Sequence, residues 1–142
     1  MSTAISSSRP ADRRDSQAAS FATRWLQPSV AVITAAGELD ASNAQALVDY
    51  ALRDADRTQR LALDLTGVGF FGTAGFSALH TLNVRCAGAD IQWVLVPSVA
   101  VTRLLRICDP DSTLPLATTM SAALTRLQAD QRRLLQLVTE PR

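Results

Sequence analysis

Lysine is absent from this sequence, in which all 14 basic residues are arginines. The absence excludes the phosphate-binding lysine of P-loop proteins and every Schiff-base mechanism, because both need a lysine amine. Histidine is nearly absent as well, since His80 is the only one. No Ser, Cys or Asp lies at a spacing that would pair with His80 as nucleophile and base. We therefore expect that the protein is not an enzyme and that His80 takes a packed or surface position on a helix.

Cysteine and long apolar runs are also scarce. Cys86 and Cys108 are the only cysteines, so neither a disulfide framework nor a zinc site is predicted, and a redox switch between them is the alternative. No apolar run reaches the roughly 18 residues of a membrane helix, and the N-terminus has no apolar signal segment. A net charge of +1 provides no strong field for nucleic acid or anionic lipid. We expect a cytoplasmic protein whose partners are neither nucleic acid nor membrane.

The length of 142 residues and the hydrophobic content of 47% suit one globular domain. Residues 1–19 are rich in Ser and Arg and show no hydrophobic periodicity, so they are predicted to form a flexible N-terminal tail. Residues 20–138 are predicted to form the single folded domain, and residues 139–142 a short C-terminal tail.

Hydrophobic periodicity predicts strands that alternate with helices. Strands are expected at 21–26, 30–36, 61–65, 91–96 and 114–117, and helices after Ser42, from Thr73 to about Cys86, after Ser98, and from Thr119 to Val138. The first two strands form a hairpin, and Pro115 restricts the last strand to a sheet edge. The resulting order, ββαβαβαβα, indicates an α/β fold with a mixed, mostly parallel sheet and right-handed crossovers.

Several helix starts carry capping residues. Ser42 followed by Gln45 has the spacing of a capping box, and both Thr73 and Ser98 are placed to be N-caps. Thr73 lies in the stretch Leu61–Phe76, which we interpret as a buried strand, a glycine-rich crossover and the opening of a helix. The glycines of this stretch match neither GxGxxG nor GxxxxGK[ST], so a nucleotide pocket is not predicted.

Two acidic residues lie at predicted strand ends. Asp40 and Asp64 raise the alternative of a Mg²⁺ site at the carboxyl edge of a parallel sheet. Such a site would need a further acidic residue nearby and a lysine, and the sequence has neither in a suitable place. We interpret Asp40 as a helix-initiating or surface residue and Asp64 as a hydrogen-bonding strand residue, and we expect neither a metal nor another cofactor.

Three segments carry a resemblance to a known family: Gly37–Asp40, Leu63–Val68 and Phe70–Phe76. Together they resemble the anti-sigma factor antagonists, whose domain is the STAS fold that is shared with the tails of sulfate transporters. The resemblance extends from about Phe21 to Leu127. It is specific in the strand-to-helix segment and generic elsewhere.

The resemblance implies a regulatory protein that binds an anti-sigma factor, often a histidine-kinase-like Ser/Thr kinase, until the antagonist is phosphorylated. The phosphorylated residue of the family follows an Asp in the pattern D-[ST]-[STA]-G-[LIVMF]. In this sequence that residue is Thr73, and Gly72 stands in place of the Asp. The resemblance also implies a partner-binding surface that contains Glu38, Asp40, Phe71, Gly72, Thr73, Ala74, Gly75 and Phe76.

The missing carboxylate at Gly72 keeps a second hypothesis open. In that hypothesis the chain is a phosphorylation-independent STAS scaffold or a ligand-sensing module, and Thr73 only caps its helix or contacts a partner. The physics of the switch is independent of this choice, because a phosphate adds about −1.5 to −2 charges beside helix N–H groups that favour an anion. The sequence leaves the oligomeric state open.

Overall fold

A computed structural model describes residues 12–16 and 18–139 of the chain. The elements in chain order are β1 (Asp12–Ser16), β2 (Ala19–Gln27), β3 (Val30–Leu39), α1 (Ala44–Leu52), the short 3₁₀ helix η2 (Ala55–Arg57), β4 (Arg60–Phe71), α2 (Thr73–Gly88), β5 (Gln92–Val96), α3 (Val99–Cys108) and α4 (Met120–Thr139). Among these residues, no helix combines the length and the apolar character that crossing a bilayer requires.

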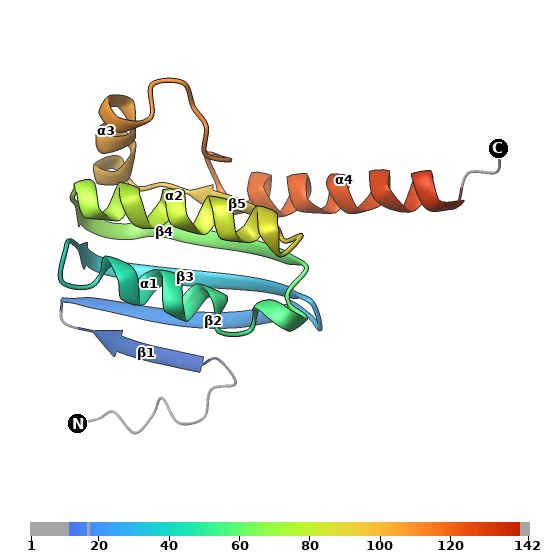
Figure 1. The fold of residues 1–142 in the computed structure, drawn as a ribbon, viewed down its shortest axis with the longest axis horizontal. Helices are drawn as coiled ribbons and strands as arrows, with labels where there is room; N and C mark the ends of the chain where they lie inside the picture. Colours follow the sequence, from blue (N-terminus) through green and yellow to red (C-terminus); the bar gives the residue numbers. More distant parts are fainter. Residues whose placement is uncertain (1–11, 17, 140–142) are drawn as a thin grey trace.

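The sheet is mixed, as predicted, with the strand order β1-β2-β3-β4-β5. β1, β2 and β3 are antiparallel neighbours, whereas β3, β4 and β5 run parallel. The hairpin predicted at the start of the chain is the β2–β3 pair. The parallel half follows from the helices, because each crossover through α1 or α2 returns the chain to the same edge of the sheet (Figure 1).

Alternation along the strands divides the core between the two faces of the sheet. On β4, Leu61, Leu63 and Leu65 belong to the larger core, which α1, α2 and α3 also line, while Ala62 belongs to a smaller core. The smaller core contains Val32, Val94 and Val96 from the strands and Ala123 and Leu127 from α4. The first turns of α4 thus cover the second face of the sheet.

Strand β1 corrects the prediction that residues 1–19 form a flexible tail. Residues 12–16 pair antiparallel with β2 in a continuous register from Asp12↔Thr23 to Ser16↔Ala19. Antiparallel pairing uses backbone N–H and C=O groups, so this strand needs no hydrophobic periodicity that a sequence would show. The rest of the predicted N-terminal tail up to residue 11, residue 17, and residues 140–142 lie outside the described residues.

The strand predicted at 114–117 is reduced to a single parallel bridge between Leu95 and Leu116. The Leu95 N–H donates to the Pro115 carbonyl at 2.8 Å, and the Ala117 N–H donates to the Leu95 carbonyl at 2.9 Å. Pro115 has no N–H of its own, so the ladder does not continue. The edge position that the proline imposes is confirmed, but a full strand is wrong.

Candidate functional site

The carboxyl ends of β3 and β4 lie side by side and bring the two halves of the predicted surface together. Glu38 pairs with Phe70 and Leu39 with Phe71 in the parallel register. The chain stays close after the strands end, because the Gly72 N–H donates to the Leu39 carbonyl at 3.0 Å. The loop before α1 and the turn before α2 therefore form one continuous edge.

The loop before α1 is held by Asn43, a residue for which the sequence predicts no role. Its buried side-chain amide donates to the Glu38 carbonyl at 2.8 Å and accepts from the Asp40 N–H at 3.0 Å. Gly37, near the end of β3, has φ +103°, and an added Cβ there would overlap the Ala18 carbonyl oxygen. A side chain that closes a loop on its own backbone gives no periodic signal, and only the turn-favouring composition of residues 40–43 hints at it.

The predicted capping box at Ser42 and Gln45 is wrong. The Ser42 N–H and hydroxyl both donate to the Asp40 carboxylate, at 2.9 and 2.6 Å, while Gln45 donates to Asp49. Asp40 competes for Ser42 because an Asp side chain readily closes a turn on the residue two positions later. The hydroxyl and N–H of Ser42 lower the pKa of Asp40. Asp40 is thus a charged, turn-forming residue at the start of α1, as the sequence indicated.

The prediction that Thr73 caps α2 is also wrong, by one residue. The N-cap is Gly72, which has no side chain to offer, and Thr73 is the first residue of the helix. The Thr73 side chain is exposed, and its hydroxyl makes no hydrogen bond with any described residue. The Gly75 and Phe76 N–H groups donate to the Gly72 carbonyl, whereas those of Thr73 and Ala74 find no acceptor within the described chain. The start of α2 is therefore open to an anion.

Two glycines shape this turn in different ways. An added Cβ at Gly75 would overlap the ring of Phe71, which is buried beneath the first turn of α2. At Gly72 the same addition would meet the Phe70 ring at 3.5 Å and the Leu39 carbonyl oxygen at 3.9 Å, which are ordinary contacts. Gly75 is thus required by packing, whereas the backbone at Gly72 has room for a side chain.

Aromatic side chains flank Thr73 on the surface. Phe70 is 52% exposed, and Phe76 is half-buried with its ring centroid 6.4 Å from that of His80. His80 is exposed on α2, which agrees with the surface position that was predicted. The edge therefore combines apolar contact area from Phe70 and Phe76 with the acidic side chains of Glu38 and Asp40.

The other candidate residues lie away from this edge or serve the fold. Asp64 accepts from the N–H and the hydroxyl of Thr66, at 2.9 and 2.7 Å, as expected of a hydrogen-bonding strand residue. Cys86 and Cys108 are free, and burial raises the pKa of the Cys86 thiol to about 12. No three His, Cys, Asp or Glu side chains of the described part come together in a way that would hold a metal.

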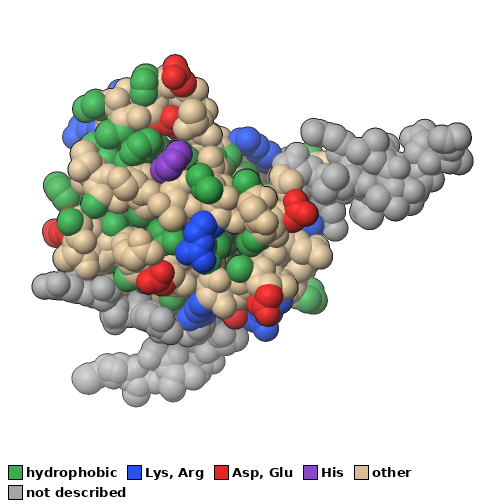
Figure 2. All heavy atoms as spheres, viewed as in Figure 1, with side chains coloured by type: hydrophobic (Ala, Val, Ile, Leu, Met, Phe, Trp, Pro, Cys, Tyr) green, Lys and Arg blue, Asp and Glu red, His purple; other side chains and the backbone are tan. Residues whose placement is uncertain are grey.

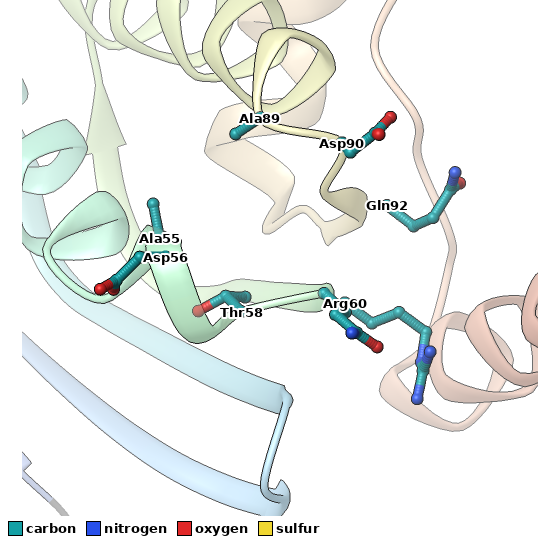
Figure 3. Close-up of a pocket in the computed structure, with 8 residues that line it drawn as sticks. Ala55, Asp56, Thr58, Arg60, Ala89, Asp90 and Gln92 are labelled. Carbon is teal, nitrogen blue, oxygen red and sulfur yellow. The ribbon is translucent and has the colours of Figure 1, made fainter.

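An open hollow of about 800 Å³ lies at the opposite edge, where β4 and β5 begin. Figure 3 shows Ala55, Asp56 and Thr58 on one side of it and Ala89, Asp90 and Gln92 on the other. None of the residues predicted to bind a partner lines this hollow. The candidate site is thus an exposed surface at the carboxyl edge rather than a pocket.

Comparison with known proteins shows the family. The model of the STAS domain matches residues 26–123, which include both halves of the carboxyl edge. The chain belongs to the STAS-domain family. It is also 35% identical over 119 residues to Osmosensory protein A of Mycobacterium tuberculosis, an alignment that covers 80% of this chain and 75% of that protein.

Solved structures of STAS domains confirm the predicted fold. An anti-sigma factor antagonist from Mycobacterium paratuberculosis has a TM-score of 0.69 and 27% identity, over 78% of this chain and 94% of its own. The anti-sigma factor antagonist SpoIIAA in its unphosphorylated form has a TM-score of 0.63 at 15% identity, over 77% of this chain and 96% of its own. This STAS domain therefore resembles anti-sigma factor antagonists, as the sequence motifs indicated.

Proposed function

We propose that this STAS domain is an anti-sigma factor antagonist whose binding is switched off by phosphorylation of Thr73. Its partner is an anti-sigma factor of the histidine-kinase-like Ser/Thr kinase type, which it contacts through Glu38, Asp40, Phe70, residues 72–74 and Phe76. Phe71 and Gly75, which the sequence also assigned to this surface, are buried and support the turn from beneath instead. The observation that carries the proposal is the position of Thr73, which is exposed at the first residue of α2 and forms no side-chain hydrogen bond with the described residues. A hydroxyl with no structural hydrogen bond is free to enter a kinase active site.

The start of α2 suits a phosphorylated side chain. A phosphate on Thr73 adds about −1.5 to −2 charges next to the N–H groups of Thr73 and Ala74, which have no acceptor within the described residues. The helix dipole favours an anion at this end. We therefore expect the phosphorylated domain to keep its fold, so that the modification acts on binding rather than on stability.

Phosphorylation would act on the partner through desolvation and charge. A partner that covers Phe70 and Phe76 must remove water from the phosphate between them, which is costly for an uncompensated charge. The same edge already carries the carboxylates of Glu38 and Asp40, so the phosphate makes it more negative still. An acidic group of the partner at this place would be repelled.

The absence of a carboxylate at Gly72 leaves one alternative to this proposal. Without a carboxylate before Thr73, a kinase has one acidic contact fewer than the family pattern provides. If Thr73 is not a substrate, the chain is a phosphorylation-independent STAS scaffold or a ligand-sensing module that uses the same edge. The two accounts differ in whether a charge at residue 73 changes binding.

Binding of purified anti-sigma factors to the wild type, Thr73→Ala and Thr73→Glu tests the proposal. We expect one phosphate on the wild type and none on Thr73→Ala by intact mass after incubation with the kinase and ATP. We also expect Thr73→Glu to bind at least about tenfold more weakly than the wild type, a loss of roughly 1.4 kcal/mol, with an unchanged circular dichroism spectrum.

Ser77→Glu is the matched control, because Ser77 is exposed on α2 one turn further along and the charge change is the same. Equal binding by the wild type and Thr73→Glu, together with no phosphate incorporation, would favour the unswitched scaffold.

A further inference from the structure

Helix α3 exposes two large aliphatic side chains more than any other among residues 18–129, whose side-chain burial is described. Val99 is 68% exposed and Ile107 is 76% exposed, whereas Val101 and Leu105 on the other side of the same helix are buried in the core. Burying a side chain of this size removes about 1.5–3 kcal/mol of unfavourable hydration, so this exposure leaves a contact surface unused.

The exposed face of α3 also carries two arginines. At about 100° per residue, positions 99, 103, 106 and 107 fall within one arc of roughly 100°, so Arg103 and Arg106 share one face of the helix with Val99 and Ile107. Figure 2 shows hydrophobic and basic side chains next to each other at the end of the molecule where α3 lies. We call these four residues the α3 face.

Arg103 and Arg106 have no ion pair or hydrogen bond with any other described residue, and α3 contains no acidic residue. Two other arginines of the described chain are engaged. The Arg57 guanidinium lies 4.3 Å from the centre of the Trp25 ring, and Arg126 donates to the Leu116 carbonyl at 3.1 Å. The two charges of the α3 face are therefore available to a partner.

The composition of the α3 face favours a protein over a polyanion. Arginine beside apolar side chains is typical of the core of protein interfaces, where it contributes much of the binding energy. Two arginines would add only about 2 kcal/mol on an anionic membrane, at about 1 kcal/mol each. A polyanion would also approach the exposed Asp111 and Glu38. A folded protein can instead place carboxylates opposite the two arginines without bringing them near Asp111 or Glu38.

The α3 face lies at the same end of the molecule as Thr73. Both α2 and α3 begin where a parallel strand ends, β4 for α2 and β5 for α3, and the two helices contact each other (Figure 1). α3 also packs against β4, the strand that leads to Thr73. A partner seated on the carboxyl edge can therefore extend onto α3.

We propose that the α3 face is a second docking element for the anti-sigma factor, which presents an acidic and apolar patch to it. Carboxylates of the partner pair with Arg103 and Arg106, and apolar side chains cover Val99 and Ile107. This proposal rests on the proposed function, and it adds the chemistry by which the chain selects its partner. Because it relies on opposite charges, it also makes association sensitive to salt.

The test compares two double charge reversals for binding to the anti-sigma factor that the wild type binds. Arg103→Glu/Arg106→Glu is expected to weaken binding at least about 30-fold and to flatten its salt dependence, because like charges then face each other. Arg24→Glu/Arg85→Glu is the matched control, since both arginines are exposed and lie outside the α3 face. The control is expected to bind within about threefold of the wild type, and Ile107→Ser to raise the dissociation rate.

The outcomes separate this proposal from the proposed function. If both double variants bind like the wild type while Thr73→Glu still binds weakly, the α3 face is not a docking element although the antagonist role stands. If the wild type binds no anti-sigma factor, both proposals fall. If light scattering shows that the wild type alone is a dimer and Arg103→Glu/Arg106→Glu a monomer, the face is covered by a second copy and the proposal is wrong.

Discussion

The N-cap residues of α2 and α3 have the same backbone geometry, but only that of α3 has a side chain that caps its helix. The N-cap of α2, Gly72, has φ −92° and ψ −179°, and the N-cap of α3, Ser98, has φ −85° and ψ 178°. The Ser98 hydroxyl accepts from the Val101 N–H at 3.1 Å, whereas Gly72 has no side chain with which to accept. The difference between the two helix starts is therefore a difference of one side chain.

The start of α2 differs from that of α3 in having no side-chain cap. At α3 the Ser98 hydroxyl accepts a hydrogen bond from a first-turn N–H group, so that helix has a side-chain cap. The first two N–H groups have no acceptor among the described residues at either helix start, and the third donates to the Ser98 hydroxyl in α3 but to the Gly72 carbonyl in α2. What α2 has in addition is the exposed Thr73 hydroxyl beside its unbonded N–H groups, where an attached phosphate would meet them. Gly72 therefore brings no side-chain acceptor of its own to these N–H groups.

The largest expected difference between α2 and α3 lies in the reactivity of their cysteine thiols. Cys86 in α2 is buried, which raises its pKa from 9.0 to about 12, whereas Cys108 at the end of α3 is partly exposed. Only a thiolate reacts, so the reactive fraction of Cys86 at pH 8 falls on the order of 10³-fold. We expect one equivalent of thiol to react rapidly with Ellman's reagent in native protein and two in guanidinium.

Cys86→Ala and Cys108→Ala assign the two phases. Rapid reaction of both thiols in native protein would mean that Cys86 is not sealed in the core, and would revive the redox switch as an alternative.

Gly75→Ala is expected to be the most destabilising change at the start of α2. The added methyl group overlaps the buried ring of Phe71, so the first turn must shift away from β4. Overpacking of this kind costs about 1–3 kcal/mol, which chemical denaturation measures. Gly88→Ala is the control, because a Cβ at Gly88 meets nothing within 4 Å. A loss no greater than that of the control would show that Phe71 does not pack beneath the turn.

Truncation of Ser98 and of Thr73 to alanine tests the comparison of the two helix starts directly. Ser98→Ala removes a cap hydrogen bond and is expected to cost about 1 kcal/mol of unfolding free energy. Thr73→Ala removes a hydroxyl that bonds to no described residue, so its cost should stay within about 0.5 kcal/mol. Equal costs for the two variants would mean that Thr73 caps α2 after all and is less accessible to a kinase.

The motif around Thr73 predicted the site from sequence, but not its hydrogen bonds. Hydrophobic periodicity was sufficient for α1 to α4 and for β2, β3 and β5, because burial against a sheet or a helix repeats along the chain. It ended β4 at Leu65, whereas that strand continues to Phe71 through the glycines that were expected to form a crossover. It was not sufficient for β1, which pairs through its backbone. Nor did it reveal Asn43, whose amide closes the loop at Glu38 and Asp40. Capping preference also placed the N-cap of α2 at Thr73 instead of Gly72. Such preferences rank residue types, but they do not say at which residue the backbone becomes helical.

Gly72→Asp fills the empty cap and should produce the smallest change in stability. The extended backbone and the ordinary contacts that a Cβ would make at this position leave room for the side chain, whose carboxylate can accept from the Ala74 or Gly75 N–H. Replacing Gly by Asp at an N-cap gains a few tenths of a kcal/mol, or roughly 1–3 °C in Tm. Gly72→Asn is the control, since it caps without adding charge and should be stabilised to a similar extent.

The informative measurement is how Gly72→Asp combines with Thr73→Glu. If both carboxylates compete for the same N–H groups, the double variant should be less stable than the sum of the single effects, and the deficit should shrink with salt because the like charges are screened. Gly72→Asn with Thr73→Glu should show a smaller deficit, which separates competition for N–H groups from charge repulsion. Strict additivity in both pairs would mean that a negative group at residue 73 does not use the open N–H groups, so phosphorylation would have to act through the partner alone.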